Sequence, residues 1–66
     1  MNVLVNGNGL ELAPAATVVQ LLEALGLETP YALVERNGEP VERERYAQVE
    51  LAEGDTVVVA RPVAGG

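Results

Sequence analysis

The stretch Thr17-Val18-Val19-Gln20-Leu21-Leu22-Glu23-Ala24-Leu25-Gly26 contains the main predicted helix together with a capping residue at each end. Thr17 and Gln20 form a capping box, in which each side chain satisfies a free backbone amide of the other residue. Gly26 stands where many helices end in a left-handed residue. One face of the helix is apolar and is formed, at helical spacing, by Val18, Leu21, Leu22 and Leu25. A helix over residues 18–25 is too short to be stable alone, so we expect it to pack on a sheet.

β-Strands are predicted on both sides of this helix. Residues 1–13 form a predicted hairpin, because two alternating apolar segments flank the dense turn signal Asn6-Gly7-Asn8-Gly9. After the helix, Tyr31–Arg36 is the third predicted strand, and Asn37-Gly38 closes it. Thr56–Ala60 is rich in valine and gives the strongest strand signal in the chain.

The segment between the third and the last strand gives weaker signals. Val41–Val49 is ambiguous, and we interpret its charged run Glu42-Arg43-Glu44-Arg45 as solvated surface. Glu50-Leu51-Ala52 is a candidate for a short strand, and Glu53-Gly54-Asp55 predicts a turn. No repeat, low-complexity stretch or linker divides the chain, so we expect one domain over residues 1–62 and a tail over residues 63–66.

One helix and a few strands around a single core predict an α+β fold of two layers. The first and last strands are the most apolar, so we expect them to pair in parallel at the centre of the sheet, with the helix as the crossover. The face toward the helix then comprises Met1, Val3, Val5, Leu10, Leu12, Ala32, Val34, Val57 and Val59. No second helix covers the opposite face, where a contiguous apolar patch indicates an interaction surface formed by Leu4, Leu33, Val58 and Ala60.

The composition argues against chemistry by the side chains of this protein. Zinc, copper and iron–sulfur sites draw on Cys and His, and nucleophilic catalysis usually uses Ser, Cys or Lys beside a base. The chain contains none of these residue types. Its hydroxyl groups have no imidazole to activate them and belong to Thr17, Thr29, Thr56, Tyr31 and Tyr46. We therefore expect no enzymatic activity, no metal site and no bound cofactor.

The charge balance restricts the partners and the compartment. Ten acidic residues and four arginines give a net charge of −6 at pH 7. Nucleic acids and anionic membranes bind Lys and Arg, so we expect neither as a partner. No apolar run reaches the length of a transmembrane helix, and the first residues lack the basic region of a signal peptide. The cytoplasm is the default compartment that follows.

The last residues of the sequence are Arg61-Pro62-Val63-Ala64-Gly65-Gly66, directly after the last predicted strand. Pro62 cannot donate to a sheet ladder, so we expect residues 63–66 to project as a thin tail. An ionised α-carboxylate, with a pKa of about 3.5, is a poor electrophile, but an adenylyl group from ATP activates it. Because glycine has no side chain and an unrestricted backbone, Gly65-Gly66 suits a narrow channel in another enzyme.

These features resemble the ubiquitin-like β-grasp family, and within it the ThiS-type sulfur carriers of thiamine biosynthesis. The resemblance covers essentially the whole chain. It rests on the opening strand Met1–Asn6, Thr17-Val18 with Leu21-Leu22, Val34-Glu35-Arg36-Asn37, Glu44-Arg45-Tyr46, Gly54-Asp55 and Ala64-Gly65-Gly66. It implies a β-grasp fold, with a mixed sheet of four to five strands and one main helix packed on one face.

The resemblance also implies a function. A ThiF-like adenylyltransferase uses MgATP to adenylylate the carboxylate of Gly66, and sulfur from a cysteine desulfurase or related persulfide donor displaces AMP to leave a thiocarboxylate. Thiazole synthase then takes this sulfur into the thiazole ring of thiamine. The residues that thread the partners' active sites would be Val63, Ala64, Gly65 and Gly66. The docking patch would be Leu4, Leu33, Val58 and Ala60.

Other functions stay open at the level of sequence. A terminal Gly66 also suits a ubiquitin-like modifier that is joined to lysines of other proteins. The small subunit of molybdopterin synthase has a similar Ala-Gly-Gly ending and supplies sulfur inside a stable complex. A structural adaptor with an incidental Gly-Gly ending is the remaining alternative.

Overall fold

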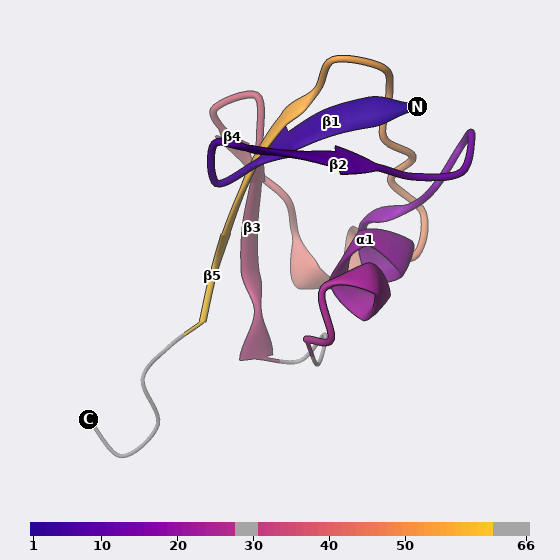
Figure 1. Cartoon of the computed structure of the whole chain (residues 1–66). Coiled ribbons are helices and arrows are strands. Elements are labelled where there is room, and N and C mark those ends of the chain that lie inside the picture. Colours follow the sequence, from indigo (N-terminus) through magenta and orange to yellow (C-terminus); the bar gives the residue numbers. More distant parts are fainter. Residues whose placement is uncertain (28–30, 62–66) are drawn as a thin grey trace.

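The computed structural model describes residues 1–27 and 31–61, which form one mixed sheet with a helix against it (Figure 1). The elements in chain order are β1 (Asn2–Val5), β2 (Asn8–Glu11), α1 (Val18–Ala24), β3 (Leu33–Arg36), β4 (Glu39–Pro40), a 3₁₀ helix at Arg43–Arg45, and β5 (Thr56–Ala60). The strand order across the sheet is β2-β1-β5-β3-β4. β1 and β5 pair in parallel, whereas the pairs β1–β2, β3–β5 and β3–β4 are antiparallel. The predicted α+β fold, with a parallel pair of first and last strands, is confirmed.

Two Asn-Gly turns connect the antiparallel pairs. Val5 pairs with Asn8, so the turn of the first hairpin consists of Asn6-Gly7 alone. Its φ angles of 50° and 85° are the positive values that a type I′ turn requires. The predicted four-residue turn is thus too long, because Asn8 and Gly9 already belong to β2. Asn37-Gly38 has nearly the same φ angles, 51° and 84°, and joins β3 to β4.

Both ends of α1 are capped as the sequence predicts. The Thr17 hydroxyl accepts from the Gln20 amide at 3.3 Å, and the Gln20 side chain accepts from the Thr17 amide at 2.8 Å. Gly26, with a φ of 73°, follows the last turn. The Leu27 amide donates to the Leu22 carbonyl and the Gly26 amide to the Glu23 carbonyl, which is the Schellman arrangement. Local side-chain hydrogen bonds therefore mark the start of this seven-residue helix, and local backbone hydrogen bonds mark its end.

The core lies between α1 and one face of the sheet, as predicted. Its buried members are Val3, Val5, Val18, Leu21, Leu22, Ala32, Val34, Tyr46, Leu51, Val57 and Val59. Met1, Leu10 and Leu12 are partly buried against this cluster. The prediction for Leu25 is wrong: its side chain is 37% exposed, because the helix ends at Ala24 and Leu25 is the C-cap.

The segment after the third strand contains the largest differences from the sequence prediction. β3 begins at Leu33 rather than Tyr31, which is 63% exposed. β4 was not predicted, since it has only two residues and one of them, Pro40, lacks the backbone donor of an interior strand. Glu50–Ala52 is not a strand: Glu50 forms an isolated bridge with Thr17.

The ambiguous stretch 41–49 completes the helix and the core. Its charged run is exposed, as predicted, and includes the 3₁₀ helix. The Val18 and Val19 amides at the start of α1 donate to the carbonyls of Val49 and Tyr46, at 3.1 Å each. The buried Tyr46 hydroxyl donates to the Ala32 carbonyl at 2.9 Å. This stretch thus satisfies donors at the helix N-terminus and links the helix layer to the approach to β3.

Candidate functional site

The predicted tail begins just beyond the last described part of the chain. β5 ends at Ala60, and the described residues end at Arg61. The predicted domain boundary at residue 62 and the tail residues Val63, Ala64, Gly65 and Gly66 lie outside the described residues. The described part of the site is therefore β5 itself, the strands beside it and the surface next to its end (Figure 1).

The predicted apolar patch lies on the sheet face opposite α1. Its members are exposed, with exposed fractions of 46% for Leu4, 52% for Leu33 and 46% for Val58, and Ala60 is exposed as well. Leu33 pairs directly with Ala60 across β3 and β5, and Val58 lies two residues before Ala60 on the same face. The three central strands β1, β5 and β3 thus each contribute to one surface.

Neighbouring residues leave this patch open and give it a polar edge. Leu4 pairs with Gly9, which has no side chain to cover it on the β2 side. On the other side Leu4 pairs with Thr56. Glu35 pairs with Val58 and shares its face, so a carboxylate stands beside the apolar side chains. The surface suits a partner with apolar side chains and a cation near Glu35.

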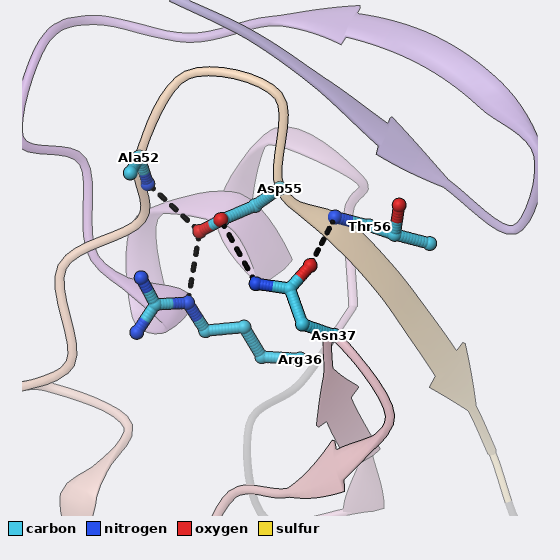
Figure 2. Close-up of polar contacts among 5 residues, drawn as sticks. All are labelled: Arg36, Asn37, Ala52, Asp55 and Thr56. Carbon is cyan, nitrogen blue, oxygen red and sulfur yellow. Dashed lines mark hydrogen bonds and ion pairs between the residues drawn. The ribbon is translucent and has the colours of Figure 1, made fainter.

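A buried carboxylate anchors the beginning of β5 (Figure 2). Asp55 is 7% exposed and accepts three hydrogen bonds, from Arg36 Nε at 2.8 Å, from the Ala52 amide at 2.8 Å and from Asn37 Nδ2 at 3.0 Å. Asn37 Oδ1 in turn accepts from the Thr56 amide at 2.9 Å. These bonds tie the turn between β3 and β4 to the loop that precedes β5.

The pKa of Asp55 lies below its ordinary value. Burial acts to raise this pKa, but the hydrogen bonds from Ala52, Asn37 and Arg36 and the positive charge of Arg36 together lower it more. Arg36 forms an ion pair with Asp55 through Nε. Sequence reasoning gave the buried network no role, because an Asp in a predicted turn is usually exposed. The signal was present in the adjacent Arg36-Asn37 and Gly54-Asp55 pairs, which the family resemblance had already singled out.

Two open hollows flank the sheet. One, of about 370 Å³, lies between the first hairpin and the end of α1 and includes Asn6, Leu10, Leu25, Val59 and Arg61. Leu25, the exposed C-cap residue of α1, is one of the residues that line this hollow. The other, of about 340 Å³, includes Arg36, Asn37 and Arg45.

Metal-binding and membrane-spanning features are not found in the described part of the chain. No group of three or more Asp or Glu side chains within residues 1–27 and 31–61 is placed to hold a metal ion. No helix of this part is long and apolar enough to cross a membrane.

A mixed five-stranded sheet, a parallel pair of first and last strands, and one helix on one face define a protein of the β-grasp, ubiquitin-like class. Residues 3–66 match the ThiS family. The chain belongs to this family, and its role is that of a sulfur carrier in thiamine biosynthesis rather than that of an enzyme.

Three similar proteins illustrate this membership. The crystal structure of the thiamine biosynthesis protein ThiS from Geobacter metallireducens has a TM-score of 0.83 and 36% identity, and the match covers both chains fully. The sulfur carrier protein ThiS of Escherichia coli is 33% identical over 66 residues, which cover 100% of each chain. A thiazole synthase of Paramagnetospirillum magneticum is 35% identical over 66 residues, which are all of this chain and 20% of that protein. The chain thus spans one fifth of the length of that relative.

Proposed function

We propose that this protein carries sulfur as a thiocarboxylate on Gly66. In the first step a ThiF-like adenylyltransferase binds MgATP, an oxygen of the Gly66 carboxylate attacks the α-phosphorus, and pyrophosphate leaves. The sulfur of a persulfide, from a cysteine desulfurase or related donor, then attacks the carbonyl carbon and AMP leaves. A thiol cleaves the resulting acyl disulfide, becomes a disulfide itself, and leaves the thiocarboxylate.

The observation that carries this proposal is the extent of the family match. The match to the ThiS family includes residue 66, and the alignment with the E. coli sulfur carrier covers every residue of both proteins. The composition also supports the Gly66 carboxylate as the reactive group, because the chain has no Cys, Ser, Lys or His side chain to carry or activate sulfur. The protein itself then binds no cofactor, and MgATP is consumed by its partner.

We assign thiazole synthase as the acceptor of the sulfur. Support comes from the thiazole synthase of P. magneticum, of which one fifth is similar to this whole chain. A carrier-like segment and a thiazole synthase in one polypeptide have a high effective concentration for each other.

The apolar patch supplies the docking surface for these partners in the proposal. Leu4, Leu33 and Val58 are each about half exposed, and Ala60 continues their surface to the last residue of β5. A partner that covers this patch also lies next to the strand that leads toward Gly66. Apolar burial at the patch would hold the domain while residues 63–66 occupy the partner's active site.

A genetic complementation experiment tests the proposed function. Deletion of the gene is expected to make growth depend on added thiazole or thiamine, and the wild-type gene restores growth without them. A matched gene that encodes one alanine after Gly66 leaves the folded domain intact but removes the Gly66 carboxylate, so it is expected not to restore growth. Growth of the deletion strain without thiazole, or full rescue by the extended protein, contradicts the proposal.

A further inference from the structure

β5 is held at both ends by asparagine side chains from the two Asn-Gly turns. Asn37, in the turn after β3, accepts from the Thr56 amide at the beginning of β5, at 2.9 Å. Asn6, in the turn after β1, binds Val59 near the end of β5. Both asparagines have left-handed φ angles, 50° and 51°, and each is followed by a glycine with a φ near 85°.

The Asn6 carboxamide makes two hydrogen bonds to the backbone of one residue. Its Oδ1 accepts from the Val59 amide at 2.9 Å, and its Nδ2 donates to the Val59 carbonyl at 3.0 Å. A primary amide has the same donor and acceptor groups as a peptide unit. The side chain therefore pairs with β5 as a further residue of a neighbouring strand would.

This pairing extends the hydrogen-bond ladder between β1 and β5 beyond the last backbone donor that β1 supplies. The Leu4 amide donates to the Asp55 carbonyl and the Asn6 amide to the Val57 carbonyl, both at 2.9 Å. The next acceptor in this series is the Val59 carbonyl, but β1 has by then turned away into the hairpin. Asn6 Nδ2 takes the place of the missing backbone donor. On its other edge, β5 stays paired with β3 as far as Ala60.

We propose that Asn6 is a positioning residue for the activation of Gly66. Its side chain holds the last residues of β5 in the sheet and so fixes the point from which residues 62–66 reach the adenylyltransferase. This inference rests on the proposed function, in which that reach matters. Val59 precedes Gly66 by seven residues, which span at most about 25 Å when extended. If the end of β5 were mobile, its backbone conformation would have to be fixed again each time the protein binds the adenylyltransferase.

The effect of losing the two Asn6–Val59 hydrogen bonds follows from the free energy needed to fix the end of β5 again on binding. Fixing the backbone of one residue costs about as much free energy as a tenfold change in an equilibrium constant. If the end of β5 loosens by one or two residues, kcat/KM for activation should fall about ten- to a hundredfold. The loss is expected mainly in KM, because the bound carboxylate is unchanged once it reaches the active site.

The test compares two matched variants, Asn6→Gly and Asn37→Gly, as full-length proteins. Glycine tolerates the left-handed φ at both positions, and each change removes two side-chain hydrogen bonds to β5 or to the residue before it. The assay is ATP–pyrophosphate exchange by the adenylyltransferase with each protein as the varied substrate, at a temperature where circular dichroism shows both to be folded. Only Asn6→Gly should raise KM strongly, although both variants lose stability.

A third variant keeps the test decisive if Asn6→Gly does not fold. Asn6→Asp tolerates the same turn and still accepts from the Val59 amide, but its carboxylate cannot donate to the Val59 carbonyl. One carboxylate oxygen then faces the Val59 carbonyl oxygen, acceptor against acceptor, so this variant should also raise KM above the wild-type value. An equal KM for the Asn6 and Asn37 variants, or a KM within about twofold of the wild type for both Asn6 variants, overturns the inference. Absence of exchange with the wild-type protein instead overturns the proposed function, and the inference with it.

Discussion

Asp55→Asn is expected to destabilise the protein strongly although it changes only one atom of the side chain. Asp55 Oδ2 accepts from both Arg36 Nε and the Ala52 amide, and Oδ1 accepts from Asn37 Nδ2. An asparagine amide nitrogen at either position meets at least one of these donors. If it replaces Oδ1, Asn37 can turn its own amide only by losing the bond from Thr56. Every orientation therefore leaves a donor facing a donor.

The size of the effect follows from the bonds that are lost. One hydrogen bond to a buried charged acceptor contributes about 1.5–3 kcal/mol. The ion pair with Arg36, whose side chain is 33% exposed, adds about 0–1 kcal/mol. The sum of about 2–4 kcal/mol is a large part of the roughly 3–10 kcal/mol expected for 66 residues. For a domain of this size it corresponds to a fall in Tm of about 10–30 °C.

The pH dependence gives a second signature. The pKa of folded Asp55 lies below its value in the unfolded chain, which is about 4. Its contribution to stability is thus fully present above about pH 5 and is lost as the pH falls through 4 toward the lower folded pKa. The difference in unfolding free energy between wild type and Asp55→Asn should shrink on acidification, because the variant lacks this titrating group.

Thermal and urea unfolding between about pH 3 and pH 7 measure both signatures. Glu53→Gln is the matched control: Glu53 accepts from the Asn2 amide at an exposed position, and the amide oxygen of glutamine can still accept. The control should therefore stay close to the wild type. A Tm of Asp55→Asn no lower than that of the control, or a difference that grows as the pH falls, contradicts the role assigned to the network.

Thr17→Ala removes the N-cap of α1 and should cost about 1 kcal/mol in urea unfolding, whereas Thr17→Ser should restore most of it; equal stability of the two variants argues against the cap. Tyr46→Phe leaves the Ala32 carbonyl without its 2.9 Å donor and should cost about 1–3 kcal/mol by the same measurement, and an unchanged unfolding midpoint contradicts this. Val58→Asp places a second carboxylate opposite Glu35 and should lower the free energy of unfolding by about 1–2 kcal/mol. Val58→Arg places a positive charge opposite Glu35 and should lower it less. In calorimetric titration both Val58 variants should bind the adenylyltransferase more weakly than wild type, and unchanged affinity removes Val58 from the docking patch.

The features that were predictable from the sequence depend on short-range patterns. The capping box at Thr17 and the left-handed Gly26 involve residues of one helix, so their spacing alone predicted the start of α1 and, to within one residue, its end. Alternation within β1 and β5 predicted which side chains face the core, and the exposure of Leu4 and Val58 confirms it. Both patterns depend only on the periods of helix and strand.

The missed features depend on contacts between distant parts of the chain. Asn6 and Val59 are 53 residues apart, and no local pattern indicates that a turn asparagine continues a strand ladder. Asp55 is hydrogen-bonded to Arg36 at the end of β3 and to Asn37 in the turn that follows, which lie 19 and 18 residues away in the sequence. Of the candidate site, the exposure of the apolar patch was predictable residue by residue. The hydrogen bonds by which Asn6, Asn37 and Asp55 hold β5 could be identified only from the three-dimensional structure.

The intact mass of the protein, purified from its own cells under thiamine limitation, bears directly on the chemistry proposed for Gly66. A fraction of the molecules should carry the mass increase of one oxygen replaced by sulfur, and fragmentation should place it on the last residue. The protein extended by one alanine after Gly66 should show no such species. A mass spectrum with only the unmodified protein, or only with lysine-linked adducts, in cells that are making thiamine would contradict a sulfur carrier that works through Gly66.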